Sequence, residues 1–320
     1  MSWFITAETG EFLAVAGEFL RAEAARNSVV LTVTENLRLN AAAHAESGPG
    51  GPMFGWWRPP AVPGRKDQGP LGAAFMHTPE FPAMLSHMSG QAAAELAGVL
   101  ADAGHRVPGI NASQEVADAF AAAWQDRTGD AVTVHRRMCL FRLGELIRPV
   151  PGPEGSARLA AERDRDLLAE WFDAFAREVG DPPRSDNRAA IDDRLGYGGI
   201  TLWQVGGVPV SIAGLTRVVA GMVRVGSVYT PPAQRGRGYA GAVTAAVSQS
   251  ALDAGVREVV LYTDLANPTS NALYQRLGYR PVGDFVELSF APAPHGLPPR
   301  RREPRESPSP QGGKDVKLHW

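Results

Sequence analysis

Residues 222–240 read MVRVGSVYTPPAQRGRGYA, and this stretch decides the fold. It opens with apolar residues typical of a strand, and Thr230-Pro231-Pro232 ends the strand because proline cannot supply a ladder donor. Small and apolar residues then predict a helix from Gly238 to Ala254, with Gly255 as its stop. A glycine-rich loop therefore lies between a strand and a helix, where unpaired backbone N–H groups and the helix dipole favour an anion.

The loop consists of Arg235, Gly236, Arg237, Gly238, Tyr239 and Ala240. Its two glycines let the backbone approach a phosphate closely and adopt positive φ where needed. Arg235 and Arg237 add positive charge that a purely structural turn would not require. A plain glycine-rich turn is the simplest alternative interpretation.

Two other phosphate-binding motifs fit this loop less well. No G-x-x-x-x-G-K-[ST] string occurs, so the P-loop is excluded. Gly236, Gly238 and Gly241 satisfy the dinucleotide fingerprint G-x-G-x-x-G, and Asp264 ends the next predicted strand. That fingerprint follows its strand directly, however, whereas residues 230–235 intervene here. Too little ordered chain also remains after Asp264 to complete a doubly wound sheet.

The elements around the loop predict a mixed α/β sheet. An amphipathic helix is expected where Leu167, Trp171 and Phe175 recur at helical spacing. The other expected elements are strands at Ile200–Val205, Val208–Leu215, Met222–Tyr229 and Glu258–Thr263, a helix at Pro268–Leu277, and a closing strand pair at Tyr279–Phe290 broken at Gly283-Asp284. The resulting order is α-β-β-β-α-β-α-β-β.

Residues 225–240 (VGSVYTPPAQRGRGYA) and 261–288 (LYTDLANPTSNALYQRLGYRPVGDFVEL) resemble the cofactor-binding core of GNAT-type N-acetyltransferases. The family shows [QR]-x-x-G-x-[GA] at this loop, and Arg235 to Ala240 match that string. The resemblance is strong over Met222 to Leu288, weaker back to Asp164 and only architectural in the first half. It implies a GNAT-like fold, acetyl-CoA (CoA) as cofactor, and transfer of the acetyl group to an amine.

The resemblance also assigns the cofactor-binding residues. The backbone of Val228, Tyr229 and Thr230 would pair with the pantetheine arm, and the N–H groups of Arg235 to Ala240 would hold the pyrophosphate. Asn267, Asn271 and Tyr274 stand at i, i+4 and i+7 and so share one helix face. Relatives use the positions matching Asn267 to contact the cofactor and Tyr274 to protonate the departing thiolate. A packed core tyrosine is the alternative for Tyr274.

The general base is less well defined. Many relatives place a glutamate on the strand before the loop, but Val223 to Tyr229 holds no carboxylate. Asp264 is one candidate, and a water-relayed proton or an acceptor amine of low pKa are the others. The missing glutamate also motivates a second function class, a non-catalytic acyl-CoA-binding regulatory module.

The first half repeats the order of the second in fainter form. A strand over Pro70 to Thr78 ends in His77-Thr78-Pro79, which we match with Tyr229-Thr230-Pro231, and residues 80–83 replace the Arg-Gly-Arg-Gly string. The following elements are expected as a helix at 91–103, a short strand at 107–110, a helix at 114–124 and a strand at 131–143. We therefore expect two tandem copies, the first degenerate. An unrelated α/β domain is the alternative.

Chain length and one Pro/Gly-rich stretch predict the domain boundaries. A chain of 320 residues exceeds one compact domain, and Pro149 to Gly155 (PVPGPEG) reads as a linker. We expect a degenerate GNAT-like domain at 1–148, a linker at 149–155, a catalytic GNAT domain at 156–290 and a disordered Pro/Arg-rich tail at 291–320.

Charge and cysteine content limit the expected partners. The net charge of −2 argues against nucleic acid or an anionic membrane as partner. One cysteine, Cys139, allows no internal disulfide and no cysteine-rich metal site, and no apolar run is long enough to span a membrane. We expect a cytoplasmic enzyme without a metal, acting on a small-molecule amine or a peptide.

Overall fold

The computed structural model describes residues 3–40, 51–59, 69–181 and 187–292. Within them the predicted mixed α/β sheet is confirmed, as one sheet of twelve strands in the order β1-β2-β3-β4-β5-β12-β6-β11-β10-β9-β8-β7. The predicted tail from residue 293 onward lies outside the described residues.

The first half of the chain supplies six of these strands. In chain order its elements are β1 (Trp3–Thr6), α1 (Thr9–Ala22), α2 (Ser28–Leu39), β2 (Met53–Trp57), β3 (Ala73–His77), β4 (Ala83–Leu85), α4 (Gly90–Asp102), β5 (Gly109–Ala112), α5 (Gln114–Thr128) and β6 (Ala131–Leu143). Helix α5 ends where Gly129 takes the left-handed conformation at φ +73°, as its glycine allows.

The second half supplies the other six strands. Its elements are β7 (Ser156–Leu159), a short 3-10 turn η1 (Glu162–Asp164), α6 (Arg165–Val179), α7 (Asn187–Gly196), β8 (Ile200–Val205), β9 (Val208–Leu215), β10 (Met222–Tyr229), a second turn η2 (Pro232–Gln234), α8 (Tyr239–Asp253), β11 (Glu258–Asp264), α9 (Pro268–Arg276) and β12 (Tyr279–Ala291). Strands β8, β9 and β10 have the predicted bounds. Strand β7 and helix α7 were not predicted.

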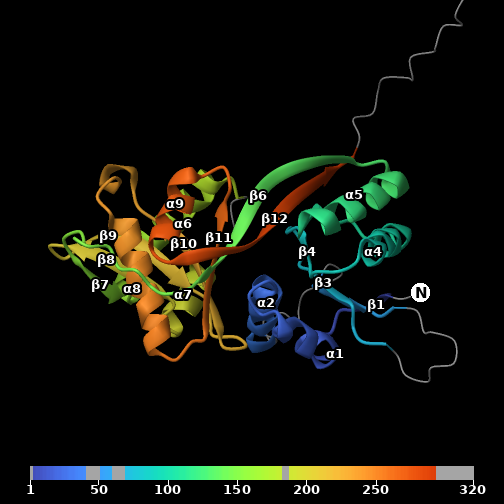
Figure 1. The fold of residues 1–320 in the computed structure, drawn as a ribbon, viewed down its shortest axis with the longest axis horizontal. Coiled ribbons are helices and arrows are strands. Elements are labelled where there is room, and N and C mark those ends of the chain that lie inside the picture. Colours follow the sequence, from blue (N-terminus) through green and yellow to red (C-terminus); the bar gives the residue numbers. More distant parts are fainter. Residues whose placement is uncertain (1–2, 41–50, 60–68, 182–186, 293–320) are drawn as a thin grey trace, which may run out of the picture.

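The two halves exchange their last strands. Strand β6, from the first half, lies between β11 and β12 of the second half and pairs antiparallel with both. Strand β12 in turn pairs with β5 of the first half. Figure 1 shows β6 and β12 as a long curved pair that joins the two parts of the sheet. The sheet therefore runs without a break across the stretch 149–155, which connects β6 to β7.

One predicted break in the sheet is wrong. The segment from Tyr279 to Ala291 is a single strand, β12, and not a strand pair interrupted at Gly283-Asp284. Its register against β6 shifts by one residue between Pro281 and Gly283. Proline lacks the ladder donor, so an irregularity at this point accommodates it while β6 keeps the strand extended on the other side.

The described elements of both halves follow one order, β-α-α-β-β-β-α-β-α-β, apart from the short turns of the second half. By this order the counterpart of β10 is β4, which is parallel to β5 as β10 is to β11. The proposed match of His77-Thr78-Pro79 with the end of β10 is therefore wrong by one strand. The counterpart of the glycine-rich loop is residues 86–89, before α4, where Ser89 Oγ accepts a hydrogen bond from Ala92 N at 3.2 Å. Tandem duplication itself stays a prediction.

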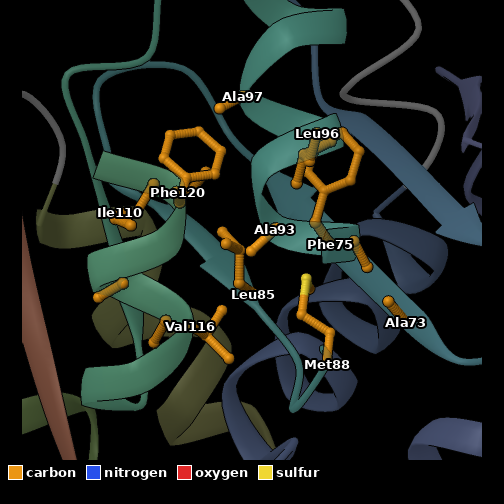
Figure 2. Close-up of a cluster of buried hydrophobic side chains, with 14 of the residues drawn as sticks. Ala73, Phe75, Leu85, Met88, Ala93, Leu96, Ala97, Ile110, Val116 and Phe120 are labelled. Carbon is orange, nitrogen blue, oxygen red and sulfur yellow. The ribbon is translucent and has the colours of Figure 1, made fainter. Parts of the chain in front are cut away.

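Packed apolar side chains fill both faces of the sheet. In the first half, Phe75, Leu96 and Phe120 lie buried between the sheet and helices α4 and α5 (Figure 2). In the second half, one cluster packs beneath α8 and α9, and another lies on the opposite face against α6 and α7. Helix α2 of the first half contacts β10, so the first half also covers part of that opposite face.

Candidate functional site

Strands β10 and β11 pair for only part of their length. Their parallel register runs from Met222 opposite Glu258 to Val225 opposite Leu261, and it stops there. Beyond that point, among the strands that the structure describes, β10 keeps only β9 as its neighbour, and β11 keeps only β6. A wedge therefore opens between the two strands at their carboxyl ends. Its edges carry backbone N–H and C=O groups without a partner strand, which suits an extended ligand that adds to the edge.

A β-bulge on β10 opens this wedge. The register of β10 against β9 shifts between Gly226 and Tyr229, and Ser227 takes φ +50°. A bulge bends its strand and interrupts the ladder locally, so β10 turns away from β11. Glycine followed by a polar residue inside an apolar strand was the sequence signal for this feature, and our sequence reading missed it.

The bulge also reverses which side chains face α8. Val223 and Val225 pack in the cluster beneath α8, so regular alternation would place Tyr229 there too. Tyr229 instead packs on the opposite face, with its ring 6.1 Å from that of Trp171, and Val228 packs against the cluster beneath α8. The end of β10 is thus held firmly by its side chains while its backbone edge faces the wedge.

The glycine-rich loop lies at the mouth of the wedge, immediately before α8. Gly236 and Gly238 take φ +76° and +82°, and Gly238 is the N-cap residue of α8. Left-handed residues in such a turn aim consecutive backbone N–H groups to one side, which makes an anion-binding concavity at the positive end of the helix. The geometry fits a phosphate group here.

The two arginines of the loop differ in their contacts. Arg235 Nε donates to the carbonyl of Thr230 at 3.0 Å, and its Nη2 donates to Glu178 of α6 at 2.5 Å. Its side chain therefore fixes the path of the loop. Arg237 is exposed and forms no ion pair with another described residue, so its charge remains available to an anion. Glu178 was not predicted, because it lies 57 residues from its partner.

The predicted residues around α9 hold the turn that follows β11. Asn267 Oδ1 accepts from Ser270 N at 3.0 Å and so caps α9. Asn271 Nδ2 donates to the carbonyls of Asp264 and Asn267 at 2.8 and 2.7 Å. Asp264 Oδ1 accepts from Ala266 N at 2.7 Å. These polar side chains place the start of α9 next to the end of β11, beside the wedge.

Tyr274 lies on α9 in the cluster beneath α8. Its ring is buried against Tyr279 at 6.0 Å, edge to face. Burial raises the pKa of Tyr274 to about 12, above the ordinary value at which a tyrosine is already protonated at neutral pH. Cys139 of β6 lies in the same cluster, and burial also raises the pKa of its thiol to about 12.

His77, the candidate in the first half, lies outside this arrangement. It ends β3 and is buried, and the loss of solvation lowers its pKa. Among the described residues, no group of three or more His, Cys, Asp or Glu side chains is placed to hold a metal ion. None of the described helices is both long and apolar enough to cross a membrane.

The comparisons with known proteins agree with this geometry. The model of the Acetyltransferase (GNAT) family matches residues 165–279. The mouse protein described as probable N-acetyltransferase family 8 member 5 is 32% identical over 93 residues, which are 29% of this chain and 40% of that protein. The chain thus spans less than half the length of this curated relative.

Solved structures share the fold over most of the chain. An acetyltransferase from the GNAT family of Colwellia psychrerythraea superposes with a TM-score of 0.53 at 12% identity, covering 91% of this chain and 100% of that one. A GCN5-related N-acetyltransferase from Sphaerobacter thermophilus gives 0.54 at 16% identity, covering 90% and 95%. A Drosophila protein gives 0.61 at 13% identity, covering 91% and 98%. The match to the acetyltransferase (GNAT) family model covers residues 165–279, the part of the second half that contains the wedge and the glycine-rich loop.

Proposed function

We propose that this protein is an acetyl-CoA-dependent N-acetyltransferase that moves the acetyl group directly to a primary amine in a ternary complex. The observation that carries the proposal is the wedge between β10 and β11, which ends at a loop with two left-handed glycines before α8. An edge for an extended arm and a site for a pyrophosphate thus lie in sequence along one path.

The chain holds the cofactor mainly by its backbone in this proposal. Val228, Tyr229 and Thr230 present the free edge of β10 to the pantetheine arm, and the N–H groups from Arg235 to Ala240 hold the pyrophosphate. Asn267 and Asn271 border the arm from the start of α9. Acetyl-CoA supplies the acyl group in an activated form, as a thioester.

The reaction requires two proton transfers, one to the departing sulfur and one from the amine. The Tyr274 hydroxyl, which is protonated at neutral pH, donates its proton to the departing sulfur. Asp264 or a water molecule accepts the proton of the amine. The carboxylate of Asp264 already accepts a hydrogen bond from Ala266 N, so a water-relayed path leaves the turn intact.

Direct transfer is favoured over a covalent acyl-enzyme. Cys139 is the one cysteine of the chain, and it is buried with its thiol pKa raised to about 12. Nucleophilic catalysis by cysteine requires the thiolate, which is scarce at neutral pH for such a group.

Release of free CoA thiol tests the proposal. Wild-type protein would be incubated with acetyl-CoA and a panel of amino acids, polyamines, aminoglycosides and peptides, with CoA binding measured in parallel by calorimetry. Thiol release that depends on an amine supports the enzyme. Tight binding of acetyl-CoA without release for any acceptor would instead favour the second candidate, a non-catalytic acyl-CoA-binding module, which the absence of a glutamate on β10 motivates.

A further inference from the structure

Three buried polar groups that have no hydrogen-bond partner among the described residues occur near one another on the sheet face opposite α8. They are Nη1 of Arg224 on β10, the hydroxyl of Tyr262 on β11 and Oγ of Ser28 at the start of α2. Tyr262 interacts electrostatically with Arg224, and it lies near enough to Ser28 for that hydroxyl to lower its pKa, although no well-formed hydrogen bond joins the two. Buried polar groups are normally paired, because an unpaired one loses its solvation without compensation.

Arg224 is the most unusual of the three. The loss of solvation is the main effect on its guanidinium and lowers its pKa, and among the described residues no carboxylate acts on it. Two other partly enclosed arginines do have acidic partners. Nη2 of Arg136 lies 2.7 Å from Oδ1 of Asp181, and Nη2 of Arg217 lies 2.5 Å from Oδ1 of Asp193. A buried cation without a counter-charge destabilises the fold. Arg224 as a whole residue is half-buried, although its Nη1 atom is enclosed.

The three groups flank the apex of the wedge. Val225 and Leu261 form the last pair of β10 and β11, and both pack beneath α8. Arg224 precedes this pair and Tyr262 follows it, so both point to the opposite face. The proposed cofactor path occupies the α8 side of the wedge. An amine therefore approaches from the face that carries Arg224, where Ser28 begins α2 and adds the positive end of a helix dipole.

We propose that Arg224, Tyr262 and Ser28 bind a carboxylate of the amine acceptor, so that the substrate is an amino-acid-like amine and not a simple polyamine. All three groups donate hydrogen bonds, and a carboxylate only accepts them, with room for two donors from one guanidinium. The inference rests on the proposed N-acetyltransferase activity and assigns its acceptor class.

Matched pairs of acceptors test this assignment. Each pair shares an amine and differs only in a carboxylate: lysine and cadaverine, phenylalanine and phenethylamine, β-alanine and ethylamine. For wild-type protein we expect kcat/KM to favour the carboxylate member by about 10-fold or more, as a charged hydrogen bond is worth that ratio. Arg224→Met should bring the ratio close to one and Tyr262→Phe should lower it in part. Arg276→Met, which removes an exposed arginine from α9, should leave it unchanged.

Several results would overturn the assignment. One is a wild-type enzyme that uses the decarboxylated amines equally well, and another is Arg224→Met protein that keeps the preference. A preference for phosphoethanolamine over ethanolamine that exceeds the carboxylate effect would assign the site to phosphate instead. If Arg224→Met lowers kcat/KM only when succinyl-CoA replaces acetyl-CoA, the carboxylate that Arg224 binds belongs to the acyl donor and not to the acceptor.

Ligand binding, measured as a shift in Tm, tests the carboxylate site without requiring turnover. In the presence of CoA, the carboxylate member of each pair should raise the Tm of wild-type protein more than its partner does, and Arg224→Met should abolish that difference. If no amine is acetylated, the proposed activity fails, and equal Tm shifts for both members would then overturn the carboxylate site as well. Arg224→Met should itself raise the Tm of the free protein, since it removes a buried unpaired charge. If that variant does not fold, Tyr262→Phe and Ser28→Ala provide the same comparison.

Discussion

Gly238 combines two properties that make it a sensitive probe of the anion site. It takes φ +82° as the N-cap of α8, and an added Cβ would meet no atom closer than 3.7 Å. Aspartate tolerates the left-handed conformation better than most residues, so Gly238→Asp should fold. Its carboxylate would occupy the anion site and repel the pyrophosphate, which would also lose a charged hydrogen bond there. CoA affinity should therefore fall by about 100-fold. Calorimetric titration with CoA measures this.

A second glycine serves as the matched control for that substitution. Gly255, beyond the other end of α8, takes φ +77° and also has open space around it. Gly255→Asp should therefore carry the same conformational cost without changing CoA affinity. Equal affinity losses in both variants would mean that the effect at Gly238 is conformational, and the pyrophosphate assignment would be lost.

Removing the hydroxyl oxygen of Tyr274 tests its role in catalysis separately from the packing of its ring. Tyr274→Phe keeps the ring against Tyr279 and should leave CoA affinity unchanged. The turnover number should fall by about 100-fold, the low end for a general acid, because a thiolate leaves readily without help. Tyr279→Phe is the control: its hydroxyl lies 2.7 Å from Ser248 Oγ, so its loss should cost about 1 kcal/mol of stability without lowering kcat. Wild-type turnover by Tyr274→Phe would make Tyr274 a core residue only.

Burial of Tyr274 also predicts how stability depends on alkaline pH. Its folded pKa, about 12, lies above the value of about 10 for an exposed tyrosine. A raised folded pKa contributes stability that is complete below pH 10 and is lost as pH rises through 12. The free energy of unfolding should therefore fall by about 3 kcal/mol on this account, and Tyr274→Phe should show a shallower decline. Urea unfolding at pH 9, 10, 11 and 12 provides the measurement, and identical slopes would contradict the burial of this hydroxyl.

The bulge on β10 is the element that creates the wedge, and Ser227 carries its strain. A β-branched residue is an outlier at positive φ, so Ser227→Val should destabilise the fold by about 1–3 kcal/mol and weaken CoA binding as the bulge relaxes. Ser289→Val, in a regular part of β12, places the same side chain at ordinary strand geometry and should be neutral. Denaturant unfolding compares the two. A neutral Ser227→Val would mean that the bulge is not strained.

Local signals explain which elements could be predicted from the sequence. Proline after β10, the glycines of the loop and Gly255 at the end of α8 each act on their own neighbours, so β10, α8 and α9 were placed within a residue or two. The bulge was missed because its effect depends on which face Tyr229 packs against, and that is decided by α6 and not by β10 itself. Arg224 was passed over for a related reason: a lysine or arginine in a strand reads as solvated until its neighbours from α2 and β11 are known.

The exchange of β6 and β12 is a property of the whole molecule that no local pattern encodes. Each strand would satisfy the same alternation of apolar and polar residues beside its own half or beside the other half. The exchange places Phe141 of β6 inside the apolar cluster beneath α8 and α9, and Leu140 inside a cluster to which both halves contribute. It places Val286 and Leu288 of β12 inside the main cluster of the first half. Neither half completes its core from its own residues.

Cutting the chain between the halves tests this interdependence. A protease site inserted between Pro151 and Gly152 lies between β6 and β7, where cleavage breaks no strand. Because β6 and β12 stay paired along most of their length, the cleaved protein should elute at the size of the intact chain and keep its CoA affinity. Residues 1–151 and 152–320 expressed separately should each be insoluble, since each lacks an inner strand and exposes long unpaired edges. Mixing the two during refolding should restore a CoA-binding complex. Separation of the cleaved halves without denaturant, or a soluble second half that binds CoA alone, would show that each half folds on its own residues and that the exchanged strands only tether them.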